Sequence, residues 1–157
     1  MKQIQLTKGE VALVDDEDFE YLNQWKWCLG QIKYASRRDK NKTIAMHRFI
    51  MNPSENLQID HIDGNTLNNQ KHNLRLCTHT ENQRNCGKQE NNTSGYKGVS
   101  KHGKKYAAQI EINKKHIHLG YWNTAEEAAR AYDKASKKLH GEFANTNFQS
   151  IGVNNEI

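Results

Sequence analysis

Two short runs in the middle of the chain alternate between apolar and polar residues. The first run, Leu57–Ile62, ends at the turn-forming sequence Asp63–Asn65, and the second run is Leu74–Cys77. Alternation of this length, bounded by turn residues, predicts two short strands joined by a loop. Thr78 and Glu81 form a capping box, which predicts a helix directly after the second strand. We therefore expect a strand, a loop, a strand and a helix in this order.

The C-terminal part carries a second alternating pattern. It predicts three antiparallel strands, at Tyr96–Ser100, Tyr106–Ile112 and Lys115–Tyr121, with a tight turn before the last one. Alternation directs one set of side chains toward a core and the other set toward solvent. The side chains expected on the core face are Tyr106, Ala108, Ile110, Ile112, Ile117, Leu119 and Tyr121.

A helix should cover this core face. Thr124 and Glu127 form another capping box, and Gly141 supplies a helix stop. The residues at helical spacing between these signals are Ala128, Ala131, Tyr132, Ala135 and Leu139. Because this stripe is narrow and rich in alanine, the helix can lie close to the sheet and leave the other sheet face free for a partner.

The first 46 residues predict supporting structure. Gly9–Val14 should form a strand, Asp15–Asp18 an acidic helix start, and Tyr34–Arg38 with Thr43–Phe49 a hairpin. The fold class expected for the whole chain is α+β. The expected divisions are a first domain at 1–86, with scaffold at 1–46 and the site-bearing part at 47–86, a polar linker at 87–94, a second domain at 95–149 and a tail at 150–157.

Composition narrows the class of protein. The net charge is +5, and six lysines but a single acid, Glu111, lie between Tyr96 and Trp122, which is typical of a surface that binds a phosphate backbone. The three cysteines lack the spacing of a zinc site or a disulfide framework, so we expect free thiols. No apolar run could span a bilayer, and the N-terminal residues do not resemble a signal peptide. We expect an intracellular protein with no membrane partner and no obligate protein partner.

Four residues of the middle segment suggest phosphodiester chemistry. Asp60 and Asn82 offer the hard oxygen ligands that suit Mg²⁺ or Mn²⁺, and such an ion can neutralise charge on a phosphate. His61 is a candidate general base, because its ordinary pKa lies near neutrality, and Asn73 is a candidate to hold its ring. One difficulty is that a regular strand sends Asp60 and His61 to opposite faces, so we expect a twist or bulge there. Each short string alone is typical of turns, but their joint spacing favours a site.

The residues Asp60–Asn65, Asn68–Asn69, Asn73–Arg75 and Glu81–Asn85 resemble the HNH homing endonucleases, which are ββα-metal nucleases of phages and mobile elements. The resemblance covers roughly residues 47–85. It implies a ββα-metal module in which Asp60 and Asn82 bind one divalent ion, Mg²⁺ or Mn²⁺, His61 is the catalytic base and Asn73 orients it. Many HNH enzymes have histidine where this chain has Asn82, although the homing subfamily uses asparagine. The family also points to the cytoplasm of a bacterial or phage-infected cell.

Nearby basic residues are candidates for DNA contact. Arg84 lies on the first turns of the predicted helix, where helix starts and guanidinium groups both favour phosphate. Similar nucleases carry a pair like His47-Arg48, and a plain strand-end role for that pair is an equal alternative.

The C-terminal part resembles the Apetala-two or ethylene-response-factor DNA-binding domain from Ser94 to Phe148. The motifs that carry this resemblance include Ser94–Val99, His118–Trp122 and Thr124–Asp133. In that family the exposed sheet face reads DNA in the major groove. This implies DNA contacts at Lys97, Ser100, His102, Lys105, Gln109, Glu111, His116 and His118. The plant proteins place arginine or tryptophan at several of these points, so their target sequence should not be assumed.

These observations predict a metal-dependent endonuclease that hydrolyses double-stranded DNA positioned by the second domain. A non-enzymatic DNA-binding regulator with an inactive nuclease scaffold is the alternative. An RNA-binding module ranks last, because the predicted sheet lacks the exposed aromatic pair that single-strand stacking needs.

Overall fold

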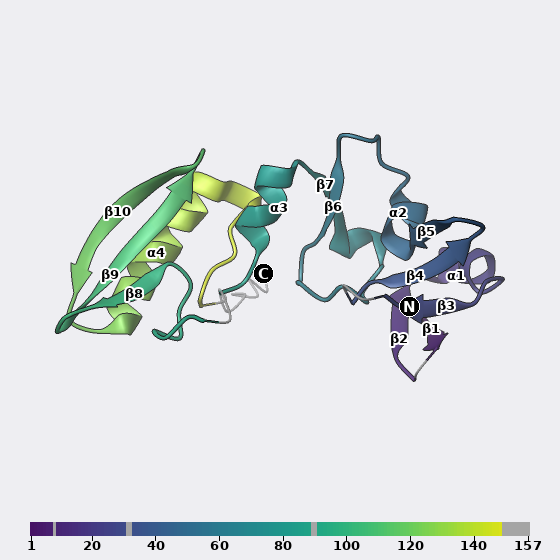
Figure 1. Cartoon of the computed structure of the whole chain (residues 1–157), viewed down its shortest axis with the longest axis horizontal. Helices are drawn as coiled ribbons and strands as arrows, with labels where there is room; N and C mark the ends of the chain where they lie inside the picture. The colour runs from purple at the N-terminus through teal and green to yellow at the C-terminus, as the bar shows by residue number, and fades with distance from the viewer. Residues whose placement is uncertain (8, 31–32, 89–90, 149–157) are drawn as a thin grey trace, which may run out of the picture. The chain divides into compact units, whose positions relative to one another are not determined.

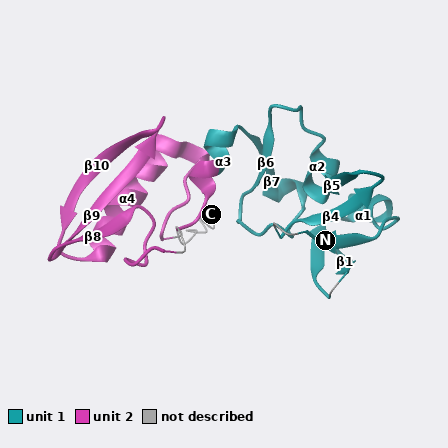
Figure 2. Ribbon diagram, viewed as in Figure 1, with its two compact units in different colours: residues 1–82 teal, residues 83–157 magenta. Residues whose placement is uncertain are grey.

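The structure is a computed structural model that describes residues 1–7, 9–30, 33–88 and 91–148 (Figure 1). The chain forms two compact units, residues 1–82 and residues 83–157 (Figure 2). The expected linker at 87–94 falls inside the second unit, and two of its residues, 89–90, lie outside the described residues, as does the expected tail at 150–157. The assignment of functional domain boundaries stays a prediction.

The first unit is built on one mixed sheet with short helices. Its strands are ordered β2-β1-β3-β4-β5, with β1 and β3 parallel and the other neighbours antiparallel. The elements are β1 (Lys2–Thr7), β2 (Val11–Val14), α1 (Asp16–Leu22), β3 (Trp27–Leu29), β4 (Ala35–Asp39), β5 (Lys42–Ala45) and α2 (Met46–Met51). Trp27 is buried in the core of this unit, and its indole Nε1 donates to the Leu22 carbonyl at 2.8 Å.

Two features of this unit differ from the sequence prediction. Strand β1 was not expected, because Lys2–Thr7 is largely polar and only Ile4 and Leu6 face the core. The expected strand through Phe49 ends at Ala45, and the chain turns into helix α2. Helix α2 buries Met46 and packs Phe49 and Ile50 on the same core. Phe49 and Ile50 lie three and four positions after Met46, so a helix can direct all three side chains toward the core.

The predicted strand, loop, strand and helix are all present. Strands β6 (Gln58–His61) and β7 (Leu74–Cys77) pair antiparallel, η1 (Lys71–Asn73) precedes β7, and α3 (His79–Asn85) follows it. The capping box also forms, because the Thr78 backbone N–H donates to Glu81 Oε2 at 2.8 Å and the Glu81 N–H donates to Thr78 Oγ1 at 3.3 Å. The loop between the strands is hydrogen-bonded to β2, because the Asn69 N–H donates to the Leu13 carbonyl at 2.8 Å.

The second unit confirms the predicted three-stranded sheet and helix, but its first strand covers Val99–His102 where Tyr96–Ser100 was expected. Gly98, with a positive φ of 72°, lies in the turn that precedes the strand. Strands β8 (Val99–His102), β9 (Lys105–Ile112) and β10 (Lys115–Trp122) form an antiparallel sheet in the order β10-β9-β8, and α4 (Ala125–His140) lies across one face, followed by η2 (Gly141–Phe143) (Figure 1). The Thr124 and Glu127 capping box forms as predicted. The core between the two layers contains Val99, Ala108, Ile110, Ala128, Ala129 and Tyr132.

Three side chains of this unit are not where the pattern placed them. Ile117 was expected in the core but is 42% exposed, although it pairs with Ile110 on β9. The pairing of β10 with β9 shifts between His118 and Gly120, and this bulge reverses the alternation. Tyr121 therefore lies opposite Ala107 on the outer face and is 51% exposed, instead of in the core. Leu139 is 39% exposed, because α4 instead turns Ser136 and His140 inward. No helix in the described ranges is both long and apolar enough to cross a membrane.

Candidate functional site

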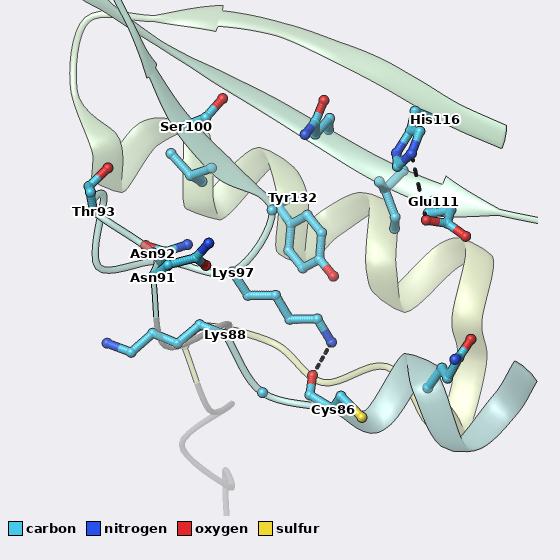
Figure 3. Close-up of a pocket in the computed structure, with 16 residues that line it drawn as sticks. Cys86, Lys88, Asn91, Asn92, Thr93, Lys97, Ser100, Glu111, His116 and Tyr132 are labelled. Carbon is cyan, nitrogen blue, oxygen red and sulfur yellow. Dashed lines mark hydrogen bonds and ion pairs between the residues drawn. The ribbon is translucent and has the colours of Figure 1, made fainter. Parts of the chain in front are cut away.

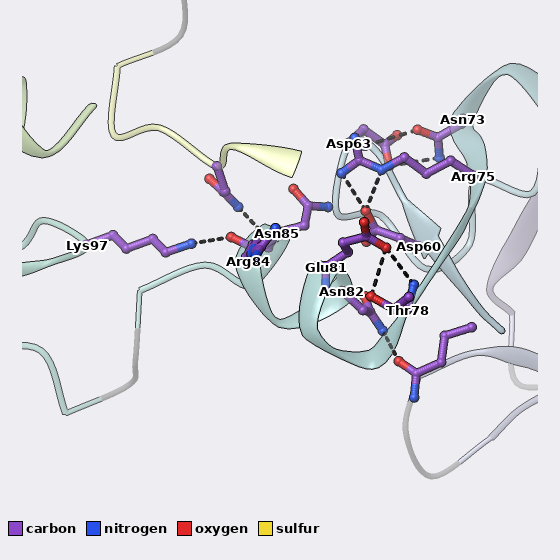
Figure 4. A network of polar contacts seen from close by, with 12 residues as sticks. Asp60, Asp63, Asn73, Arg75, Thr78, Glu81, Asn82, Arg84, Asn85 and Lys97 are labelled. Atoms are coloured by element: carbon purple, nitrogen blue, oxygen red, sulfur yellow. Dashed lines mark hydrogen bonds and ion pairs between the residues drawn. The ribbon is translucent and has the colours of Figure 1, made fainter. Parts of the chain in front are cut away.

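The carboxylate of Asp60 lies beside the guanidinium of Arg75 at the centre of the β6 and β7 pair (Figure 4). Arg75 Nε and Arg75 Nη2 both donate to Asp60 Oδ2, at 2.8 and 2.6 Å. The two residues are cross-strand partners, and Asp60 is only 5% exposed. A buried carboxylate needs such a partner, because leaving its charge unpaired away from water is costly.

Asn82 reaches the same face of β6 from helix α3. Its Nδ2 donates to Gln58 Oε1 at 2.9 Å, which sets the rotation of the amide (Figure 4). Gln58 and Asp60 are two positions apart on β6, so their side chains lie on one face of the strand. The structure therefore brings Asp60 and Asn82, the two predicted metal ligands, to the same face. Their role as ligands stays a prediction.

His61, the last residue of β6, is enclosed by two other rings. Its imidazole stacks on Tyr34, with ring centroids 5.8 Å apart, and meets the edge of the His47 ring at 5.2 Å. His47 and Tyr34 also contact each other, at 4.7 Å. These rings come from α2 and from the residue before β4, so the mixed sheet fixes their position. His61 is 4% exposed and His47 is 7% exposed.

Burial sets the protonation of both histidines. It lowers the pKa of His47 from 6.5 to about 4, with smaller effects of the same sign from His61 and Arg48. Burial also lowers the pKa of His61, although the neighbouring Asn69, Asp63 and Asp60 act in the opposite direction. Both rings are therefore neutral at pH 7, and a neutral imidazole can accept a proton.

Asn73 holds the loop that follows His61. Its Nδ2 donates to Asp63 Oδ1 at 2.9 Å and to the Asn68 carbonyl at 2.8 Å, and its Oδ1 accepts from the Asp63 N–H at 3.0 Å. Burial tends to raise the pKa of Asp63, but hydrogen bonds from Asn68, Asn65 and Asn73 keep it below its usual value. Any control of Asn73 over His61 therefore passes through this loop and the backbone, where the Ile62 N–H donates to the Asn73 carbonyl at 2.9 Å.

The bulge expected between Asp60 and His61 is absent from the described strand. Pairing runs without interruption from Gln58 opposite Cys77 to His61 opposite Leu74. Asp60 therefore faces Arg75 while His61 faces Tyr34 and His47. Asp60 and His61 therefore point to opposite sides of β6. Because the strand ends at His61, a substrate can contact both side chains only at this end of the strand.

The donor chemistry around Asp60 fits a hard divalent cation. A buried carboxylate and an amide oxygen on one face are suitable ligands for Mg²⁺ or Mn²⁺. Among the described residues, no three His, Cys, Asp or Glu side chains are grouped to hold a metal. Water and substrate phosphate would therefore have to complete the coordination, as is common for Mg²⁺ sites.

The outer face of the second unit is polar and accessible. Seven of the eight residues expected there are exposed, namely Ser100, His102, Lys105, Gln109, Glu111, His116 and His118. Glu111 and His116 approach each other at 3.7 Å. Tyr121 joins this face between two histidines, with ring centroids 5.1 Å from His102 and 4.5 Å from His118. We call Tyr121, His102 and His118 the aromatic strip. DNA contact by these residues stays a prediction.

Lys97 does not belong to that face. Its Nζ donates to the carbonyls of Arg84 at 2.6 Å and Cys86 at 2.5 Å, and burial lowers its pKa. The side chain crosses a hollow of about 480 Å³ that is lined by residues of 83–88 and 91–100, by the sheet and by Tyr132 (Figure 3). Lys97 therefore holds the end of α3 in the second unit, where the sequence predicted a DNA contact.

The other basic candidates are placed differently from one another. His47 is buried against His61, so it cannot be an exposed phosphate contact, and the structure makes it a neighbour of the candidate base. Arg48 is exposed, and its Nη1 donates to the Leu57 carbonyl at 3.4 Å. Arg84 lies on α3, partly exposed.

Comparison with known proteins identifies the class of protein. A family model described as HNH endonuclease matches residues 52–84. An uncharacterised HNH endonuclease of Acanthamoeba polyphaga mimivirus is 34% identical over 148 residues, which are 89% of this chain and 76% of that protein. Protein 3.8 of Escherichia phage T7 is 38% identical over 88 residues, which are 55% of this chain and 72% of that protein.

The chain belongs to the HNH endonuclease family. Its C-terminal part is in addition similar to plant transcription factors of the Apetala-two and ethylene-response group. An ethylene-responsive transcription factor of Medicago truncatula is 44% identical over 72 residues, which are 42% of this chain and 30% of that protein. Both resemblances expected from the sequence are therefore confirmed, and together they imply DNA binding.

Sequence reasoning missed three residues around the site. Gln58 could have been found, because it lies two positions before Asp60 and so shares its strand face. Arg75 could have been found from the expected strand pair. Tyr34 carried no local signal, since it lies 27 residues before His61 and meets it only through the tertiary fold. His47 was noticed, but as a DNA contact.

Proposed function

We propose that this protein is a metal-dependent endonuclease that hydrolyses phosphodiester bonds in duplex DNA, with the second unit positioning the DNA. Asp60 and Asn82 would hold one Mg²⁺ or Mn²⁺ ion, and His61 would act as the general base. The relative in a phage fits a homing-type role inside a bacterial or phage-infected cell.

The observation that carries this proposal is the buried, neutral imidazole of His61 at the end of the strand that also carries the buried Asp60 carboxylate. Its lowered pKa keeps the ring ready to take a proton from an attacking water at neutral pH. Tyr34 and His47 restrict the ring, and Asn73 anchors the loop that follows it. A bound divalent cation supplies charge neutralisation at the phosphate and leaving oxygen.

The outer face of the second unit supports DNA as the substrate. Its exposed lysine, histidine and amide side chains suit contacts to phosphates and base edges, and a pair of strands fits the major groove of B-DNA. Lysine and histidine make fewer bidentate guanine contacts than arginine, so phosphate contacts should carry much of the affinity. Binding should therefore weaken steeply as salt concentration rises.

Cleavage of supercoiled plasmid with Mg²⁺ tests the catalytic role. We expect the wild type to convert the plasmid to nicked or linear product, and His61→Ala to lower the rate about 10² to 10⁴-fold, because the general base is removed. His72→Ala is the matched control, since this histidine is exposed in the same unit. Binding of the same DNA is measured in parallel by gel shift.

The same experiment separates the nuclease from the alternative, a DNA-binding regulator with an inactive nuclease scaffold. That alternative has one observation in its favour, the ion pair that Arg75 makes with Asp60. If wild type and His61→Ala both bind the plasmid and neither cuts it with Mg²⁺, Mn²⁺ or other divalent ions, the regulator is the better description.

A further inference from the structure

The guanidinium of Arg75 is hydrogen-bonded to the Asp60 carboxylate, which the proposed function assigns as a metal ligand. Its guanidinium gives two hydrogen bonds to the single oxygen Asp60 Oδ2, at 2.8 and 2.6 Å (Figure 4). The side chains are 12% and 6% exposed, so solvent screens this pair poorly. The pair is neutral as it stands, and a divalent cation at Asp60 would place two positive groups on one carboxylate.

The small number of charged groups among the expected ligands makes this competition important. The described residues hold no trio of His, Cys, Asp or Glu that could bind a metal, and the second expected ligand, Asn82, carries no charge. Asp60 is then the only negative ligand that this donor set supplies. A cation bound there without DNA would face the poorly screened repulsion of Arg75, and of its two expected protein ligands only Asp60 would be negative. A phosphate supplies the missing negative charge.

We propose that Arg75 couples metal binding to DNA binding. In the DNA-free protein its guanidinium holds Asp60 and keeps metal affinity low. When DNA is bound, a phosphate oxygen gives the guanidinium another partner of the geometry it prefers, and Asp60 becomes available to the cation. By linkage, the metal must then strengthen DNA binding by the same factor. This inference rests on the proposed function, because it takes Asp60 as a metal ligand.

The test measures Mn²⁺ affinity by titration calorimetry on the full chain carrying His61→Ala, so that DNA stays intact. Each variant is titrated alone and with a saturating short duplex, and heats from duplex alone are subtracted. We expect the His61→Ala protein to bind Mn²⁺ at least about 10-fold more tightly with the duplex, which is about 1.4 kcal/mol of coupling. Adding Arg75→Gln should raise the DNA-free affinity about 10-fold and remove most of the gain from DNA.

Arg38→Gln is the matched control, because Arg38 is an exposed arginine on β4 of the same unit. It should leave both Mn²⁺ affinities unchanged. Arg75→Lys keeps the charge without the two-point hydrogen bond, so it should raise the DNA-free affinity by a smaller factor than Arg75→Gln. Asp60→Ala should abolish Mn²⁺ binding in both conditions.

Loss of Arg75 leaves Asp60 buried without this partner, and this lowers the stability of the fold. Thermal melting therefore gives a second reading that does not depend on activity. Mn²⁺ should raise the melting temperature of Arg75→Gln more than that of Arg38→Gln. If Arg75→Gln binds Mn²⁺ no more tightly than its parent without DNA, the inference is overturned, while the proposed function stands. If the parent binds no Mn²⁺ even with DNA, both fail.

Discussion

The two candidate sites of this chain differ in the exposure of their polar side chains. In the first unit Asp60, His61 and Asn73 are buried, and each is held by neighbouring side chains. In the second unit the polar residues of the outer sheet face are exposed, and their ordering comes from the strand backbone. Catalysis gains from groups fixed away from water, whereas reading DNA needs groups that remain accessible. Substitutions in the two units should therefore have different effects on stability, cleavage and DNA binding.

The largest expected effect is at Gly98, where the second unit depends on a missing side chain. Gly98 has a φ of +72°, and a Cβ there would lie 2.1 Å from the Tyr132 ring and 2.8 Å from the Gln109 carbonyl oxygen. We expect Gly98→Ala to destabilise the second unit by about 3 to 5 kcal/mol and to abolish DNA binding. Thermal melting and gel shifts measure this.

Gly103→Ala is the control for Gly98. It shares a positive φ, +60°, but apart from its chain neighbours no atom lies within 4 Å of the position that a methyl group would take. It should cost only about 1 to 2 kcal/mol. Equal melting temperatures for the two variants would show that the contact with Tyr132 is unimportant.

Acid should weaken the first unit through His47. Its pKa falls from 6.5 to about 4 on folding, so the unfolded chain binds more protons between these pH values, and stability is lost as pH falls. We expect a loss of up to roughly 3 kcal/mol between pH 7 and pH 4. Urea unfolding followed by fluorescence of Trp25 and Trp27 would report it.

Substituting the histidine isolates this contribution. His47→Gln should flatten the pH dependence, leaving the part due to His61, whose pKa is lowered in the same direction. Replacing the exposed His72 by Gln should change nothing. An unchanged slope in His47→Gln would contradict the assigned cause.

Substitution of Asn73 tests whether the ordering of the loop after His61 affects cleavage independently of DNA binding. Asn73→Ala removes three hydrogen bonds that tie Asp63 and Asn68 to η1, so we expect cleavage to fall about 30 to 100-fold, equivalent to about 2 to 3 kcal/mol. Plasmid cleavage and gel shift together measure it. A fall in DNA affinity of the same size would mean that the loop binds DNA and does not serve catalysis.

The smallest expected effect is on the exposed aromatic strip. Tyr121→Ala should weaken duplex binding about 5-fold, roughly 1 kcal/mol, because an aromatic side chain on a reading face can make apolar contacts with thymine methyl groups. Tyr121→Phe should keep most of the affinity. Ile117→Ala, an exposed residue that pairs with Ile110 on the other side of β10, is the control. Equal weakening by both alanine variants would argue against a specific contact.

Much of the fold could be predicted because its signals are local. The capping boxes at Thr78 and Thr124 and the alternation in β9 specify backbone conformations within a few residues, and all three are present. Alternation failed for Tyr121, because the register shift between His118 and Gly120 reverses the faces of the residues that follow, and alternation of residue types does not reveal such a bulge. Helical spacing failed for Leu139, because α4 packs the face that carries Ser136 and His140 against the sheet.

The sequence by itself determined the residue types of the candidate site and the strand, strand and helix that carry them. It also determined the class of protein, since the spacing of Asp60, His61, Asn73 and Asn82 identified the family that the comparisons confirmed. Only the tertiary structure decided which side chains meet. It brought Tyr34 and His47 onto His61, turned Lys97 inward and set Arg75 on Asp60. Burial and pairing depend on residues distant along the chain, and these control the charge and mobility of each group.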